Sequence, residues 1–339
     1  MKPTTIPTIL LCMTAVCCAG QVRRGTLHST ALSRNIGYIA VLPDNYSQQV
    51  AGGKRFPVVY LLHCAGCDTG SWVNEPGYCT PLTNHVDSAG YIFVAPDDGQ
   101  VLSWWLDSPV RQNSSYSTFL VGEFKPFVDA TFATVPDRAH TGVAGHSMGG
   151  FGALHNIIAH PDVFGAAYSL MGGADIAPCQ NNWGLSSILG ADPAQYRQNC
   201  RAVNPVDNAC KLVGQNVSLA FVSGTADFFH SGNALLHRVL DSCGVAHQYN
   251  AGVDTTAGHS PIPQEYSRAM VSFFDSVFAS AVPVSRPSVT TRDVVRGAGS
   301  SGFVACTITG RRLGSQRSRW PAGVVLSFGH DRRRVVRVR

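Results

Sequence analysis

Short runs of apolar residues alternate with longer segments of helical periodicity along most of the chain. The short runs are rich in β-branched and aromatic residues and end in, or directly before, Gly, Pro, Cys or Asp, which is typical of buried strands with their following turns. These runs are residues 36–43, 56–64, 91–97, 141–144, 166–173 and 217–227. Apolar residues recur at helical spacing over residues 116–132, 151–164 and 262–280. The pattern predicts an α/β fold.

The alternation of strands with helices indicates a mainly parallel central sheet that helices cover on both faces. Residues 21–282 are expected to form this domain. In sheets of this kind, ligands bind beyond the carboxyl ends of the strands. The residues that directly follow each apolar run are therefore the candidates for chemistry.

The composition is that of a protein with a sizeable core. Of 339 residues, 45% are hydrophobic and 14% are charged, which excludes a chain that is disordered throughout. No apolar run reaches the length of a membrane-spanning helix, so no integral membrane span is expected.

The basic charge is concentrated at the C-terminus. Residues 283–339 hold 12 Arg, no Lys and 2 Asp, and the preceding residues are mildly acidic although the whole chain has a formal charge of +5. The charge therefore does not indicate a nucleic-acid partner for the main domain. Gly and Ser clusters with no amphipathic helix predict a disordered Arg-rich tail. A polyanion or membrane-surface anchor and a frame change in the sequence are the alternatives.

Residues 1–20 have the pattern of a signal peptide. Lys2 precedes an apolar stretch that ends in small residues around Gly20 and is too short to span a membrane. Cleavage near Gly20 and a secreted protein are expected. Lipid modification at Cys17 or Cys18 is the alternative.

Eight cysteines follow this segment, and export makes disulfides their expected use. They are Cys64, Cys67, Cys79, Cys179, Cys200, Cys210, Cys243 and Cys306. Cys179, Cys200 and Cys210 share one loop-rich stretch and are expected to contribute one bridge. Cys64-x-x-Cys67 has no partner motif at zinc spacing, so no metal site is expected there.

The pentapeptide at residues 145–149, GHSMG, matches the G-x-S-x-G pattern of a nucleophile elbow. It follows one apolar run and precedes a helical segment, as that turn requires. Its glycines allow a sharp strand-to-helix turn that places the Ser147 hydroxyl above the sheet. The backbone N–H of Met148 would face a developing oxyanion at the positive end of the following helix. Ser147 is therefore the predicted nucleophile.

A serine hydroxyl needs a base, and the base needs an acid that orients it. In the α/β-hydrolase arrangement the acid and then the histidine follow the serine. Asp227 follows the last apolar run, and His259 lies in the loop before the C-terminal helical segment. These two are the predicted acid and base. The candidates in weaker positions are Asp207, Asp241, Asp254, His230, His237 and His247.

The second donor to the oxyanion is expected in the loop after residues 56–62. The backbone N–H of Ala65 is the candidate, with that of Cys64 as the alternative.

Five motifs, in order and at roughly the usual spacing, resemble the esterase D-like branch of the α/β-hydrolases. This branch includes S-formylglutathione hydrolases, carbohydrate-esterase family 1 feruloyl and acetylxylan esterases, tributyrin-type esterases and antigen 85 mycolyltransferases. The motifs are LLHCAGCDTGSW (61–72), SWWLDSP (103–109), GHSMGGFGAL (145–154), GTAD (224–227) and GHS (258–260).

The resemblance covers about residues 25–280 and implies an α/β-hydrolase fold. It also implies a triad of Ser147, Asp227 and His259 that uses no metal and no cofactor. This chain departs from the family at Cys64 and Cys67, where glycine is usual. A bridge from Cys67 to Cys64, or to Cys79 instead, would stiffen the loop.

Trp104, Trp105 and Asp107 lie where relatives line the substrate pocket. The two aromatic residues are expected either to stack on a sugar or phenolic ring or to include one core residue. Cys64 and His146, beside the oxyanion loop and the nucleophile, are further candidates for substrate contact.

The resulting hypothesis is a secreted serine carboxylic-ester hydrolase that acts on feruloyl, acetyl or other short acyl esters of carbohydrates. One alternative is a secreted acyltransferase of the mycolyltransferase type, in which a sugar hydroxyl replaces water. The other is a non-catalytic binding protein on a hydrolase scaffold.

Overall fold

The computed structural model divides the chain into two units, Met1–Val282 and Pro283–Arg339. The expected signal peptide, Cys79 and Cys306 lie outside the residues that the structure describes. Within those residues, no helix is both long enough and apolar enough to cross a bilayer. The described residues are 21–73, 90–251, 253–254, 256–281, 324–328 and 332–336.

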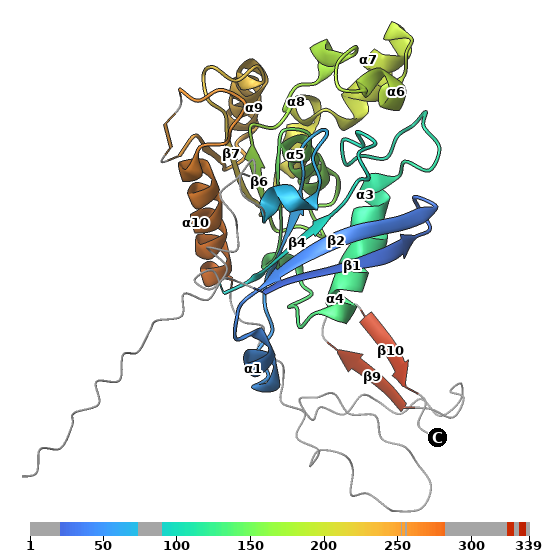
Figure 1. Cartoon of the computed structure of the whole chain (residues 1–339), viewed down its shortest axis with the longest axis vertical. Coiled ribbons are helices and arrows are strands. Elements are labelled where there is room, and N and C mark those ends of the chain that lie inside the picture. The colour runs from blue at the N-terminus through green and yellow to red at the C-terminus, as the bar shows by residue number, and fades with distance from the viewer. Residues whose placement is uncertain are drawn as a thin grey trace, which may run out of the picture. The chain divides into compact units, whose positions relative to one another are not determined.

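An eight-stranded sheet forms the centre of the first unit (Figure 1). The strands lie in the order β1-β2-β4-β3-β5-β6-β7-β8. The pairs from β4 to β8 are parallel, and β2 pairs antiparallel with both β1 and β4. The strands are β1 (Gln21–Ser29), β2 (Arg34–Leu42), β3 (Val58–Leu62), β4 (Ile92–Pro96), β5 (Thr141–His146), β6 (Ala166–Leu170), β7 (Ser218–Val222) and β8 (Gln248–Tyr249).

Helices and short turns of helix connect these strands. A π-helical segment, Phe119–Phe124, joins α3 to α4 at the position where Pro126 offers no N–H to the helix. The α-helices are α1 (Tyr46–Ala51), α3 (Tyr116–Thr118), α4 (Lys125–Thr131), α5 (Met148–Ala159), α6 (Leu185–Leu189), α7 (Pro193–Val203), α8 (Pro205–Asn208), α9 (His230–Cys243) and α10 (Gln264–Ser280). The 3-10 turns are η1 (Thr69–Trp72), η4 (Arg138–His140), η5 (Ala177–Cys179) and η6 (Ala209–Leu212).

The sheet is buried on both faces. In β3, Val58, Tyr60 and Leu62 belong to one apolar core, whereas Val59 and Leu61 belong to the other. Helices α4, α5 and α9 contribute to the first core and α10 to the second, and Figure 1 shows α10 apart from the other helices. The predicted α/β fold, with a mainly parallel sheet and helices on both faces, is confirmed.

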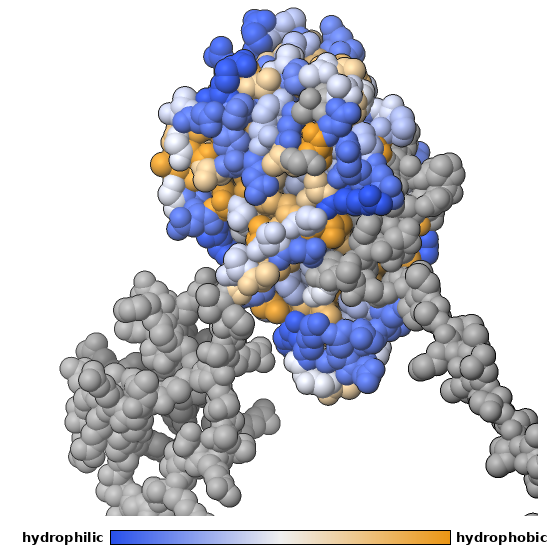
Figure 2. All heavy atoms as spheres, turned by 90° about the vertical axis from the view of Figure 1, so that its left-hand side faces the viewer, coloured by the Kyte–Doolittle hydropathy of each residue, from blue (hydrophilic) through white to orange (hydrophobic). Residues whose placement is uncertain are grey.

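Figure 2 shows the side of the molecule on which α10 lies in Figure 1. Hydrophilic residues dominate this face, and the hydrophobic areas between them are small and separate. Scattered apolar residues of this kind are ordinary on a globular protein and do not define a docking site.

Two disulfides lie among the described residues, Cys64–Cys67 and Cys210–Cys243. The expected bridge within the loop-rich stretch is therefore corrected, because η6 packs against α9 and brings Cys210 to the end of that helix. Cys179 and Cys200 are free thiols. Burial raises the pKa of the Cys200 thiol to about 12.

The second unit contains a two-stranded antiparallel sheet in its described residues. Strand β9 (Val324–Phe328) pairs with β10 (Arg332–Val336). The sequence pattern predicted no element here, because the segment lacks amphipathic helical spacing and is interrupted by Gly and Arg runs.

His146, the last residue of β5, is a buried histidine. Its exposed fraction is 3%. Burial, and to a smaller extent the nearby His259 ring, lowers the pKa of His146 to about 3. The folded protein therefore holds this imidazole neutral over a pH range in which the unfolded chain protonates it.

We expect His146 to make the stability of the protein sensitive to acid. As the pH falls from about 6.5 to about 3, the unfolded chain gains a proton at His146 that the folded chain does not bind, so the free energy of unfolding decreases. When the pH is lowered from about 7 to about 4.5, the free energy of unfolding should decrease in both proteins. The decrease should be smaller in His146→Gln than in the wild type, by roughly 2 kcal/mol. Urea titrations of both proteins at the two pH values measure this difference. Equal losses would contradict the prediction.

Candidate active site

Ser147 occupies the sharp turn between β5 and α5. Its backbone angles are φ 56° and ψ −115°, a region that costs a non-glycine residue about 1–3 kcal/mol. The Ser147 N–H donates to the Leu170 carbonyl at the end of β6, at 2.9 Å. Neighbouring strands therefore hold the turn in a strained conformation that a flexible loop would not keep.

Close packing beneath this turn requires glycine. A Cβ on Gly149 would lie 1.9 Å from the carbonyl oxygen of Leu62, the last residue of β3. Helix α5 can therefore begin directly against the end of β3. This contact brings the loop after β3 beside the loop that carries Ser147.

Ser147, His259 and Asp227 form a continuous chain of hydrogen bonds. His259 Nε2 lies 2.9 Å from Ser147 Oγ, and His259 Nδ1 lies 2.9 Å from Asp227 Oδ1. The Asp227 carboxylate can only accept, so Nδ1 carries the proton and Nε2 is left to accept the serine proton. The structure thus brings together the three residues that the sequence singled out, in the geometry of a nucleophile, a base and an orienting acid.

The Asp227 side chain is fully buried, whereas 16% of the His259 side chain is exposed. Asp227 Oδ1 also accepts the Phe229 N–H at 2.9 Å, and Oδ2 accepts the Ser223 hydroxyl at 3.3 Å. A carboxylate held by several donors keeps its charge and its orientation despite burial. Asp227 is therefore built to hold an imidazole rather than to meet solvent.

The loop of Asp227 and the loop of His259 are in direct contact. A Cβ on Gly224 would lie 1.9 Å from the Ala257 carbonyl oxygen. Glycine at this position lets the turn after β7 approach the segment that precedes His259. The spacing between acid and base is thus set by backbone packing.

The loop after β3 forms a tight turn that a disulfide closes. The Cys67 N–H donates to the Cys64 carbonyl at 3.1 Å, and Gly66 has a φ of 72°. A glycine is favoured at such a position. Cys64 and Cys67 are bridged at the two ends of this turn, which leaves Ala65 half-buried at its first corner.

His63 fixes this loop from below. Its Nδ1–H donates to the Cys64 carbonyl at 2.9 Å, and its Nε2 accepts the Asp98 N–H at 3.0 Å. The His63 carbonyl in turn accepts the Trp105 indole N–H at 3.1 Å. Both ring nitrogens are thus occupied, and the His63 side chain serves as a support for the Ala65 turn.

Trp104 and Trp105 are core residues. Their exposed fractions are 1% and 0%, so neither offers a ring face to a substrate, and the core-packing alternative describes both. Asp107 is exposed, and its carboxylate accepts the Thr118 N–H at 2.9 Å and the Thr118 hydroxyl at 2.6 Å. It anchors the start of the helix that follows.

Cys64 and His146 are also buried. The His146 ring lies 5.2 Å from the His259 ring, between centroids. His146 Nε2 lies 3.3 Å from the His259 carbonyl oxygen. Its place is therefore behind the base, where it supports the His259 loop.

An exposed pair of aromatic rings lies beside the base, and the sequence analysis missed it. Phe228 and Trp183 stack with centroids 5.2 Å apart and are 54% and 38% exposed. The Phe228 ring lies 4.0 Å from the His259 ring. These two rings, with Phe229, line a cavity of about 210 Å³. The available signal was the Phe-Phe pair directly after Asp227.

The comparisons with known proteins agree with this site. The family model described as "Putative esterase" matches residues 29–247. "Esterase Rv1288" of Mycobacterium tuberculosis is 32% identical in an alignment of 227 positions that covers 60% of this chain and 47% of the relative. The chain thus spans about half the length of these mycobacterial relatives. Mouse S-formylglutathione hydrolase is 25% identical over 65% of this chain and 80% of its own length.

Many solved structures share the fold. A ferulic acid esterase superposes with a TM-score of 0.59 at 24% identity, covering 77% of this chain and 99% of its own. MPT51 of Mycobacterium tuberculosis superposes with a TM-score of 0.60 at 16% identity, covering 77% and 100%. The resemblance to the esterase D-like branch of the α/β-hydrolases is confirmed, and the chain belongs to the esterase family.

Proposed function

We propose that this protein is a secreted serine carboxylic-ester hydrolase in which Ser147, His259 and Asp227 form the catalytic triad. The observation that carries the proposal is the unbroken hydrogen-bond chain from Ser147 Oγ through His259 to the buried Asp227 carboxylate. It stands at a strained strand-to-helix turn, where a serine hydroxyl is presented to a substrate.

In the first half of the reaction, Ser147 Oγ attacks the ester carbonyl carbon while His259 Nε2 takes the hydroxyl proton. The negative charge then moves to the carbonyl oxygen. The backbone N–H groups of Ala65 and Met148 are the proposed donors to it. Met148 suits this role because the first N–H groups of a helix have no acceptor within the helix. Collapse of the intermediate expels the alcohol, which receives the proton from Nε2, and leaves an acyl group on Ser147.

The second half repeats these steps with water. His259 Nε2 takes a proton from water as the oxygen attacks the acyl carbon, and it returns that proton to Ser147 Oγ as the acid departs. Asp227 remains charged throughout and stabilises the imidazolium. Neither half requires a metal or a cofactor for its balance of protons and bonds.

For the substrate, we propose esters of aromatic acids, of which feruloyl esters of carbohydrates are one class. The Phe228 ring lies beside His259, and the Trp183 ring stacks on Phe228. Both rings are exposed, and a pair of this kind suits a planar phenolic ring. The adjoining cavity of about 210 Å³ is large enough for one such ring, since a cavity of about 150 Å³ accepts benzene.

Secretion is proposed from the apolar N-terminal segment and from the disulfides. The described residues contain two bridges, Cys64–Cys67 and Cys210–Cys243. Such bonds persist in oxidising compartments. One bridge closes the proposed oxyanion loop, so the activity itself would depend on export.

Replacing the nucleophile should abolish turnover without unfolding the protein. We expect Ser147→Ala to lower kcat on p-nitrophenyl esters by at least about 10⁴-fold, because the attacking oxygen is lost. Steady-state kinetics measure this loss, and circular dichroism and Tm monitor the fold. Ser242→Ala, at an exposed serine on α9, is the matched control and should keep full activity. Turnover retained by Ser147→Ala would refute the triad.

The aromatic pair should select the acyl group. We expect Trp183→Ala and Phe228→Ala each to lower kcat/KM on methyl ferulate by roughly three- to tenfold, the worth of one aromatic contact. The activity on methyl butyrate should change by less than about twofold, because its acyl chain offers no ring to stack.

The two esters share methanol as the leaving alcohol, so the comparison isolates the acyl group. Val213→Ala, at an apolar residue that is 56% exposed, is the control for loss of surface apolar area. Equal losses on both esters would show that the pair does not select an aromatic acyl group.

A further inference from the structure

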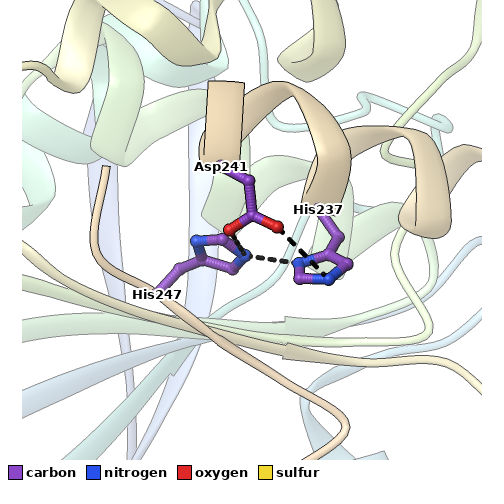
Figure 3. A group of neighbouring side chains, drawn as sticks. All are labelled: His237, Asp241 and His247. Atoms are coloured by element: carbon purple, nitrogen blue, oxygen red, sulfur yellow. Dashed lines mark hydrogen bonds and ion pairs between the residues drawn. The ribbon is translucent and has the colours of Figure 1, made fainter. Parts of the chain in front are cut away.

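A cluster of two histidines and one aspartate lies outside the triad and has no part in the reaction. His237 and Asp241 lie one turn apart on α9, and His247 comes from the segment that leads into β8. Figure 3 shows the three side chains pointing toward one another. Their possible ligand atoms all lie within 4.8 Å of one another.

The geometry joins both rings and the carboxylate. His237 Nδ1 lies 2.7 Å from His247 Nε2. Asp241 Oδ2 lies 3.5 Å from His237 Nε2, and Asp241 Oδ1 lies 3.9 Å from His247 Nε2. The His247 side chain is 4% exposed, whereas those of His237 and Asp241 are 40% and 61% exposed. One ligand is therefore rigid and buried, and the other two face solvent.

His247 is preset to accept rather than to donate. Its Nδ1 lies 2.8 Å from the Val245 carbonyl oxygen, which can only accept, so the neutral ring carries its proton on Nδ1 and leaves Nε2 bare. The His247 ring also stacks on Phe221, with centroids 5.7 Å apart. A backbone carbonyl that orients the ring and fixes its tautomer is the usual second partner of a metal-binding histidine.

With His247 Nε2 bare, the cluster has more hydrogen-bond acceptors than donors. If His237 donates from Nδ1 to His247, its own Nε2 is bare and faces the Asp241 carboxylate, so two acceptors oppose each other. A cation among the three residues removes this opposition. A metal ion held by one nitrogen of each ring and by the carboxylate would supply that cation.

We propose that His237, Asp241 and His247 form a binding site for a divalent transition metal of the zinc class. Two imidazole nitrogens and one carboxylate oxygen are ligands that Zn²⁺ accepts, and water completes the tetrahedron on the open side. Nitrogens bound to one zinc at about 2.0–2.1 Å stand about 3.3 Å apart. With His237 Nδ1 as the ligand atom, the ring would withdraw by about 0.6 Å from its present distance of 2.7 Å to His247 Nε2.

A second group of the same residue types does not qualify. His63 lies within 3.7 Å of the carboxylates of Asp97 and Asp98. Its two ring nitrogens, however, are already held by the Cys64 carbonyl and the Asp98 N–H. No lone pair of that ring is available to a metal.

The ion would join the end of α9 to the start of β8. Strand β8 has only two residues and pairs with β7 at the edge of the sheet. The next residue, Asn250, accepts the Ser223 N–H at 2.7 Å through its side chain, and Ser223 donates to Asp227. Metal binding should therefore stabilise the edge of the sheet that supports the catalytic acid.

The test is Zn²⁺ and Co²⁺ binding to the whole protein, freed of metal by a chelator and dialysed. We expect the wild type to bind about one more equivalent of Zn²⁺ than His237→Gln or Asp241→Asn does, as measured by titration calorimetry. Both substituted positions are exposed, so these variants should fold. Co²⁺ should give visible absorption bands of a four-coordinate ion in the wild type, and Zn²⁺ should raise its Tm.

His28→Gln is the matched control, because His28 is an exposed histidine whose nearest polar partner is Asn35 at 3.0 Å. It should bind Zn²⁺ as the wild type does. In the two site variants we expect affinity to fall by more than about tenfold, since even the outer partners of a metal ligand are worth that much. Absence of this equivalent in the wild type, or its full retention in both site variants, would overturn the proposal.

Discussion

The contact between the start of α5 and the end of β3 is the constraint on which the candidate site depends. Gly149 lies so close to the Leu62 carbonyl that no side chain fits between them. This packing holds the Ser147 backbone in its strained conformation. It also places the Ala65 turn next to Ser147. Together with the hydrogen bond from the Ser147 N–H to the Leu170 carbonyl, it offsets the cost of a positive φ at a serine.

The fold and the meeting of Ser147, Asp227 and His259 could be predicted from the sequence because both follow from short local patterns. Asp227 comes directly after an apolar run, and parallel strands bring the ends of such runs to one edge of the sheet. Ser147 is marked by the glycines that its turn requires. His259 is the histidine of the last loop before α10. Chain order and strand polarity therefore constrain each residue before any coordinates are known.

The rest could not be predicted because it depends on contacts between distant segments. Trp183 lies in the stretch between β6 and β7, whose turns of helix carry no periodicity that says which residue faces the site. Cys210 meets Cys243 because η6 packs on α9, and neither residue's position in the sequence indicates the other. His237 was a weaker candidate than His259 for the base because it lies in a helical pattern, yet the same helix places Asp241 one turn away on the same face.

The acid and the base are held by a common edge of the sheet. Ser223 and Asn250 exchange two hydrogen bonds, in which the Asn250 side chain pairs with the Ser223 backbone N–H and carbonyl. The Ser223 hydroxyl then reaches Asp227. A displacement of β8 would thus be transmitted to the carboxylate through two hydrogen-bonded residues, so a short edge strand bears on the orientation of His259.

Trp104 and Trp105 show how buried residues can determine a substrate site that they do not touch. Both have left-handed backbone angles, with φ of 52° and 54°, which are costly for bulky residues. This conformation allows both indoles to donate a hydrogen bond. The Trp105 N–H donates to the His63 carbonyl, next to the Ala65 turn, and the Trp104 N–H donates to the Trp183 carbonyl at 3.0 Å. One strained dipeptide therefore ties the proposed oxyanion loop to the proposed aromatic pocket. The relative position of the reacting carbonyl and the acyl ring would depend on this tie, because the two indoles hold the backbone on both sides of the proposed site.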